Sequence, residues 1–146
     1  MNQNSTTLAH ADLTDKIIGI FYDVYNELGF GFLESVYEQA LIIALAEAGL
    51  RADCQVPVPV WFRGQQIGDF KADLIVESTV VPELKAVRSI DAVFEKQLLN
   101  YLRGTNLEIG LILNFGPRAE FRRLAYSNER KKIRVYPRAS AAKTSL

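Results

Sequence analysis

The stretch EIGLILNFG, from Glu108 to Gly116, constrains the fold more than any other, because it is short and almost purely apolar. A run of this length is typical of a β-strand that is covered on both of its faces. Covering both faces requires helices on each side of the sheet that contains the strand. The stretch therefore predicts an α/β protein in which a central sheet packs between helices.

Three helices are expected around the sheet. Apolar residues recur at helical spacing from Asp12 to Leu28, and a second such segment runs from about Leu33 to Ala48. The sequence GFG, Gly29 to Gly31, separates the two helices. A third helix, IDAVFEKQLLNYLRG, is expected over residues 90–104 and is closed by a glycine.

The middle of the chain has the pattern of β-strands. Successive strands are expected in CQVPVPVWF, DFKADLIVE and VVPELKAV, and one further strand in FRRLAY after the apolar stretch. The two prolines of CQVPVPVWF favour a place at the edge of the sheet. The resulting order is α-α-β-β-β-α-β, which indicates one mixed sheet flanked by helices.

Length and composition indicate a single folded domain. The chain has 146 residues, and its 49% hydrophobic and 23% charged residues argue against general disorder. We expect a flexible tail over residues 1–11, the domain over residues 12–127 and a basic C-terminal segment over residues 128–146. No membrane span or signal peptide is expected. Cys54 is the only cysteine, which fits a cytoplasmic location.

The charges are distributed unevenly along the chain, although the net charge is zero. Residues 1–117 carry 8 basic and 15 acidic residues, whereas residues 118–146 carry 9 basic and 2 acidic residues. Basic clusters can contact phosphate groups. We therefore predict contacts with nucleic acid at the basic positions of this end of the chain, which are Arg122, Arg123, Lys131 and Lys132. A solvated tail would explain the same charges.

Glu83 and Lys85 are the charged residues of the strand VVPELKAV and project to the same face of it. Buried charges must be paired, hydrogen-bonded or bound to a metal. Asp73 on the preceding strand can approach Glu83 if the two strands form a hairpin. Two adjacent carboxylates suit a hard cation such as Mg²⁺, with the backbone carbonyl of Leu84 as a further ligand. An edge strand that carries charges to prevent pairing is the alternative.

The motifs GFLESVY, DLIVE, ELKAV, QLLNYL and GLILNFG occur in an order that resembles the GxxExxY protein family of the PD-(D/E)XK nuclease superfamily. The resemblance covers about residues 13–126. It implies a restriction-endonuclease-like αβββαβ core and a divalent metal, Mg²⁺ or Mn²⁺. It also implies that the nuclease site is formed by Glu34, Asp73, Glu83, Lys85 and Gln97, with Tyr101 completing a Q-x-x-x-Y motif.

The sequence departs from this family pattern at three positions. Pro82 stands where a small apolar residue usually precedes the glutamate, and it predicts a break or bulge in the strand. Phe94 and Tyr25 stand where the family often has histidines. The carboxylates and the lysine of the motif are all present.

The favoured function is therefore metal-dependent hydrolysis of phosphodiester bonds, with DNA preferred over RNA as the expected substrate. In this hypothesis Lys85 positions the attacking water or stabilises negative charge. A non-catalytic module of the same fold is the main alternative; it would bind nucleic acid or act as a scaffold or homodimer. Hydrolysis of small nucleotides is a third hypothesis.

Overall fold

The computed structural model describes residues 3–131, with side chains from His10 onward. Two helices come first, followed by three strands, a third helix, two further strands and a short 3-10 helix. The bounds are α1 Gln3–Leu28, α2 Glu34–Glu47, β1 Ala52–Phe62, β2 Gln65–Val76, β3 Val80–Lys85, α3 Ala92–Gly104, β4 Ile109–Phe115, β5 Ala119–Ala125 and η1 Asn128–Arg130. Each helix and strand expected from the sequence is present.

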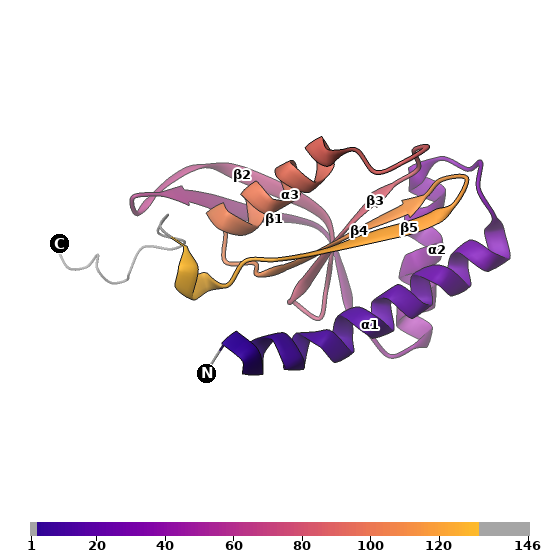
Figure 1. The fold of residues 1–146 in the computed structure, drawn as a ribbon, viewed down its shortest axis with the longest axis horizontal. Coiled ribbons are helices and arrows are strands. Elements are labelled where there is room, and N and C mark those ends of the chain that lie inside the picture. The colour runs from indigo at the N-terminus through magenta and orange to yellow at the C-terminus, as the bar shows by residue number, and fades with distance from the viewer. Residues whose placement is uncertain (1–2, 132–146) are drawn as a thin grey trace.

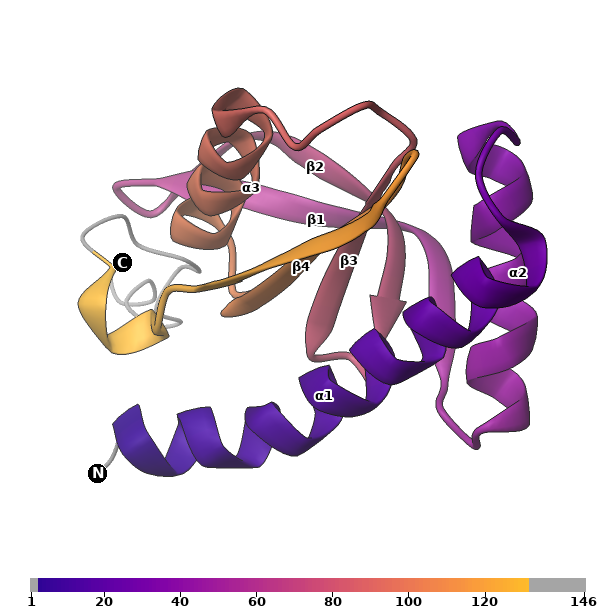
Figure 2. The same cartoon turned by 45° about the vertical axis from the view of Figure 1, so that its right-hand side comes forward.

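The strands form one mixed sheet in the order β1-β2-β3-β4-β5. The β3–β4 pair is parallel, and the other neighbouring strands are antiparallel. Figures 1 and 2 show α3 on one face of the sheet and α1 on the other, with α2 packed beside α1. This arrangement confirms the α/β, restriction-endonuclease-like architecture in which helices flank a mixed sheet.

The strand β4 lies at the centre of the hydrophobic core, and all 7 of its residues are buried. Leu111 and Leu113 pack into the cluster that includes the inner faces of α1 and α2. Ile112 points to the opposite face and packs into the cluster beneath α3. The apolar stretch is therefore covered on both faces, as its sequence predicted.

The positions of β1 and β3 in the sheet bear on the two interpretations of the charged strand. β1 carries both prolines and is an edge strand, as expected. β3 carries Glu83 and Lys85 and is the third of the five strands. β3 is therefore not an edge strand of the sheet as a whole, but beyond Val80 the described pairing of β3 is with β4 alone, so the alternative in which the charges prevent pairing stays open.

Pro82 does not shift the register between β3 and β4, which runs without interruption from Val80 to Lys85. On its other side, β3 pairs with β2 through the single pair Val76–Val80. A proline has no amide hydrogen to donate to a neighbouring strand. The expected irregularity is thus absent from the β4 side, while the pairing with β2 ends two residues before Pro82.

Two differences concern the ends of the chain. Helix α1 begins at Gln3, so most of the segment expected to be a flexible tail is helical. Residues 3–11 contain neither glycine nor proline to stop a helix. At the other end, residues 128–130 form η1, and Lys132 with the rest of the basic segment lies outside the described residues. No described helix is long and apolar enough to span a bilayer.

Candidate active site at the divergence of β2 and β3

The candidate site lies where β2 and β3 separate after their pairing at Val76 and Val80. Extending that antiparallel register by three residues along each strand places Asp73 across from Glu83. Because the strands diverge, the space between these two residues is not closed by a hydrogen-bonded ladder. The hairpin therefore brings one carboxylate from each strand to the region where the pairing ends, and Asp73 acts electrostatically on Glu83 there.

Glu83 is influenced by burial and by three charged neighbours. Its burial raises the pKa of its carboxyl group above the ordinary value, Lys85 opposes that rise, and the charges of Asp73 and Glu34 add to it. Burial raises a carboxyl pKa because it disfavours the charged form, and neighbouring carboxylates act in the same direction. Carboxylates from α2, β2 and β3 thus act on one another at this point.

The ammonium group of Lys85 lies between a carboxylate and an aromatic ring. Its Nζ atom is 4.0 Å from Oε2 of Glu83 and 4.2 Å from the centroid of the Phe94 ring. The side chain of Lys85 is only 20% exposed. Attraction to the face of an aromatic ring favours a cation, so both contacts hold a positive charge beside Glu83.

A cavity of about 40 Å³ opens next to Lys85. Its volume is enough for roughly two or three water molecules. The residues that line it come from β2, β3 and α3: Phe70, Glu83, Lys85, Phe94, Gln97, Leu98 and Tyr101. Gln97 is thereby placed beside the two charged residues of β3. Tyr101 stacks on Phe70, with ring centroids 4.2 Å apart.

The first turn of α2 brings Glu34 close enough to influence the pKa of Glu83. The loop before this helix is fixed by Tyr37, which is fully buried. The Tyr37 hydroxyl donates to the carbonyl of Gly29 at 2.6 Å and accepts from the amide of Phe32 at 3.2 Å. These bonds set where α2 begins, and hence where Glu34 projects.

Glu38 is a carboxylate at this site that the sequence reasoning did not identify. Burial raises the pKa of its side chain, and the charge of Asp73 adds to the rise. Glu38 lies four residues after Glu34 and so occupies the same face of α2. That spacing is the sequence pattern by which it could have been found.

Gln55 is the second residue that the sequence did not indicate. It lies on β1 with a φ of 54°, a left-handed conformation that is uncommon for residues other than glycine. Its Nε2 donates to Oδ1 of Asp73 at 3.5 Å, the long limit for such a bond. No local pattern indicates this contact, because it depends on how β1 pairs with β2.

The side chain of Leu84 packs on the opposite face of the sheet, with the core cluster of α1 and α2. This follows from the alternation of side chains along a strand, which leaves Glu83 and Lys85 together on the other face. Any contribution of Leu84 to the site is therefore limited to its backbone.

The described basic residues predicted to contact nucleic acid, which are Arg122, Arg123 and Lys131, have partners within the chain. Nε of Arg122 is 3.4 Å from Oε2 of Glu95, and Nη2 of Arg123 is 2.7 Å from Oδ1 of Asp15. Both arginines are exposed on β5. Each arginine is thus paired with a carboxylate of the chain, and its contact with nucleic acid stays a prediction.

Lys131 is more tightly held than the two arginines. Its ammonium donates to the backbone carbonyls of Thr105 and Leu107 at 2.7 and 2.8 Å. Burial lowers the pKa of Lys131 to about 8, and the charge of Glu108 opposes that shift. In this conformation its ammonium provides hydrogen-bond donors to two carbonyl groups in the segment just after α3.

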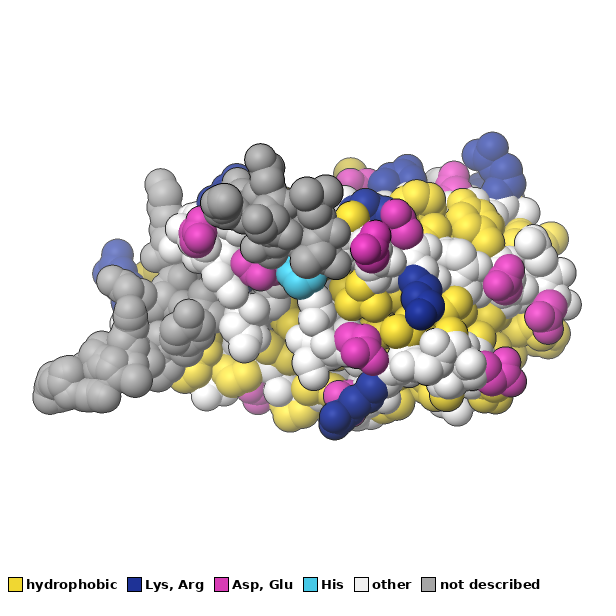
Figure 3. Space-filling view, turned by 90° about the horizontal axis from the view of Figure 1, so that it is seen from below, with side chains coloured by type: hydrophobic (Ala, Val, Ile, Leu, Met, Phe, Trp, Pro, Cys, Tyr) yellow, Lys and Arg dark blue, Asp and Glu magenta, His cyan; other side chains and the backbone are white. Residues whose placement is uncertain are grey.

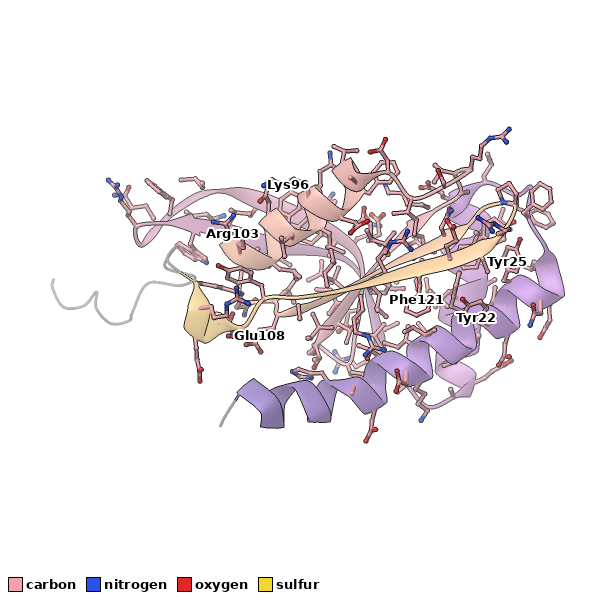
Figure 4. The ribbon with its side chains drawn as sticks, in the orientation of Figure 1. Tyr22, Tyr25, Lys96, Arg103, Glu108 and Phe121 are labelled. Atoms are coloured by element: carbon pink, nitrogen blue, oxygen red, sulfur yellow. The ribbon has the colours of Figure 1, made fainter. Side chains whose placement is uncertain are left out.

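Tyr25, which the sequence comparison singled out as a departure from the expected histidine, has a structural role away from the cavity. Its hydroxyl lies 2.8 Å from the carbonyl oxygen of Gly116 and 2.9 Å from that of Pro117. Figure 4 shows Tyr25 and Tyr22 on α1 directed towards β4 and β5, where Tyr22 packs against Phe121. Tyr25 therefore anchors the β4–β5 turn on α1.

The donors at the candidate site are oxygen atoms, which suit a hard divalent cation. Asp73 and Glu83 provide two carboxylates, and Mg²⁺ needs only one or two together with water molecules. Within residues 3–131, no three acidic, histidine or cysteine side chains converge closely enough to surround a metal by themselves. The donor set fits an ion that retains several waters or substrate oxygens.

The match to a known protein family agrees with this architecture. A family model described as the PD-(D/E)XK nuclease superfamily matches residues 11–124. No curated protein matches the chain. A solved structure titled "Crystal structure of SSO0001" is similar at 20% sequence identity with a TM-score of 0.49. That match covers 64% of this chain and 50% of the other, so the aligned region spans half the length of that protein.

Proposed function

Because the chain belongs to the PD-(D/E)XK nuclease superfamily, we propose that it is a metal-dependent nuclease that hydrolyses phosphodiester bonds in DNA. The observation that carries this proposal is the position of Glu83 and Lys85. Both lie at a small cavity on the central strand of the sheet, and Glu83 is within electrostatic reach of Asp73 and Glu34. The ordered motifs around Glu34 and Tyr37 support assignment to the GxxExxY family within the superfamily.

In this proposal Asp73, Glu83 and the backbone carbonyl of Leu84 hold Mg²⁺ or Mn²⁺. The bound ion supplies Lewis-acid polarisation of a phosphoryl oxygen and activation of a water molecule. Repulsion among the carboxylates around Glu83 is relieved by a cation, which gives the site affinity for a divalent ion.

Lys85 supplies a positive charge next to the position proposed for the scissile phosphate. A fixed cation in a partly dehydrated pocket stabilises the charge that develops during phosphoryl transfer. Its contacts with Glu83 and Phe94 keep the ammonium in place before substrate binds. Gln97 is suited to orient water through its amide, and Glu34 adds a carboxylate at the rim of the site.

The proposal is tested by incubating the full chain with single- and double-stranded DNA and RNA, in Mg²⁺, Mn²⁺ or EDTA. Lys85→Ala and Asp73→Asn are expected to abolish a metal-dependent cleavage. Matched controls are Lys71→Ala and Asp69→Asn, which change the same residue types at exposed positions of β2. Cleavage that survives both site substitutions, or that is equally lost in the controls, would refute the assignment.

A non-catalytic module is the second candidate, and one observation favours it. The ammonium of Lys85 already has a carboxylate and an aromatic partner within the chain, as a purely structural ion pair would. Isothermal titration with Mg²⁺ and Mn²⁺ discriminates between the candidates. A nuclease site requires divalent-ion binding that is weakened by Asp73→Asn and Glu83→Gln, whereas a structural pair predicts no such dependence.

A further inference from the structure

We propose that the groove between α1 and α2 is a docking site for a basic, amphipathic helix of a partner protein. The groove has a volume of about 450 Å³. Glu34 and Glu38, the α2 residues of the candidate active site, do not line it. The proposal therefore stands independently of the nuclease function.

The two walls of the groove have the same spacing of residues. Residues of α1 line it at positions 20, 23, 24, 27 and 28, and residues of α2 at positions 40, 43, 44, 47 and 48. Each set follows the three- and four-residue repeat of one helical face. By the rise of an α-helix, each wall is about 12 Å long. Two helix faces that line one groove in this way can receive the side chains of a third helix.

The floor of the groove is apolar and accessible. Ile20 and Val24 are nearly buried at its base, while Ile43 is 60% exposed and Leu28 is 36% exposed. Ala44 lies on the α2 wall and is small enough to let another helix approach closely. Contiguous apolar surface of this kind typically marks a contact site. In Figure 3, hydrophobic side chains gather on the right-hand part of the face seen from below, with acidic side chains among them.

The charges around the groove identify the class of partner. Asp23, Glu27 and Glu47 line it and are exposed. None of the three has an ion-pair partner among the residues that the structure describes. An apolar floor with acidic edges is complementary to a helix that has an apolar face flanked by lysines or arginines.

The same charges disfavour a second copy of this chain as the occupant. In a two-fold symmetric dimer the same surface patch meets itself. Glu27 and Glu47 of one copy would then face carboxylates of the other, and close like charges repel. A partner that carries the opposite charge removes this repulsion.

The test uses the full chain and a fluorescent peptide of about 18 residues, with leucines on one helical face and lysines on the other. A matched peptide has glutamates in place of the lysines. Fluorescence anisotropy should show saturable binding of the lysine peptide only. Raising NaCl from roughly 50 to roughly 500 mM should weaken this binding, because salt screens the exposed charges.

Three variants locate the binding. Ile43→Asp should abolish it, because the variant places a charge in the apolar floor. Glu27→Lys should weaken it about tenfold, by replacing an attraction with a repulsion. Ile67→Asp, at an exposed apolar position of β2, and Glu34→Lys, at the candidate active site, should bind like the unchanged protein. Circular dichroism confirms that each variant is folded.

Several outcomes would overturn the proposal. Equal binding of the two peptides would mean that the acidic residues do not select the partner. Binding that persists in Ile43→Asp, or that is lost in Glu34→Lys, would place the peptide elsewhere. A dimer in sedimentation experiments that dissociates in Ile43→Asp would show that a second copy occupies the groove.

Discussion

Replacing Asn114 by alanine is expected to destabilise the protein strongly, because this side chain closes the end of the central strand pair. Asn114 on β4 is completely buried. Its Oδ1 accepts from the amide of Val87, and its Nδ2 donates to the carbonyl of Val87, both at 2.9 Å. Asn114 is the register partner of Lys85, where the backbone pairing of β3 with β4 ends. Beyond Lys85, the two side-chain bonds to Val87 take the place of that pairing.

The size of the effect follows from those two bonds. Each contributes about 1 kcal/mol net, and a group left without a partner costs about 1–3 kcal/mol when water cannot reach it. Val87 is half-buried, so water recovers part of this cost. Asn114→Ala should therefore lower the free energy of unfolding by about 2–4 kcal/mol. For a chain of this size the melting temperature should fall by roughly 5–12 °C.

Urea unfolding followed by circular dichroism measures this change. The matched control is Asn100→Ala, because Asn100 is exposed on α3 and should alter stability by no more than about 0.5 kcal/mol. If the proposed nuclease activity is present, it should fall in Asn114→Ala, since Val87 follows Lys85 closely along the chain. A loss of stability below about 1 kcal/mol, equal to that of the control, would refute the role assigned to the two bonds.

Three further predictions concern stability. Gly116→Ala should destabilise the fold by about 1–3 kcal/mol in urea unfolding, because the added Cβ would lie 1.9 Å from the carbonyl oxygen of Val87; an unchanged midpoint would contradict that contact. Burial raises the pKa of Glu83 above its ordinary value of 4.5. The stability that the protonated Glu83 side chain contributes is therefore fully present below pH 4.5 and is lost as the pH rises through the raised pKa. Without divalent ions, Glu83→Gln should therefore raise the melting temperature at neutral pH, with a gain that shrinks on acidification; a decrease at neutral pH would count against it. Burial lowers the pKa of Lys131 from 10.5 to about 8. As the pH rises through that interval, the free energy of unfolding of the unchanged protein should therefore increase relative to that of Lys131→Met in urea titrations. A difference between the two proteins that stays constant with pH would argue against the shift.

The elements of the fold were largely predictable because their patterns are local. The apolar stretch in β4 requires cover on both faces, and the two prolines of β1 favour an edge position over a central one. The start of α1 was not predictable in this way. Polar residues without glycine or proline are compatible with either a helix or a tail, and periodicity alone does not decide between them.

The candidate site was predictable only in part. The alternation of a β-strand places Glu83 and Lys85 on one face, and the hairpin spacing brings Asp73 towards them. Gln55 could not be found in this way, because its contact with Asp73 depends on the pairing of β1 with β2. Phe94 stood out in the sequence only as a departure from a family pattern, whereas the structure places its ring against Lys85.

The sequence by itself determined which residues share a strand or helix face, because side-chain direction repeats with a fixed period along each element. Only the tertiary structure decided which of those faces meet. It placed Glu38 within electrostatic reach of Asp73, paired Arg123 with Asp15 and left the groove between α1 and α2 open. These outcomes depend on how separate elements pack, and packing is set by the whole core rather than by any local segment.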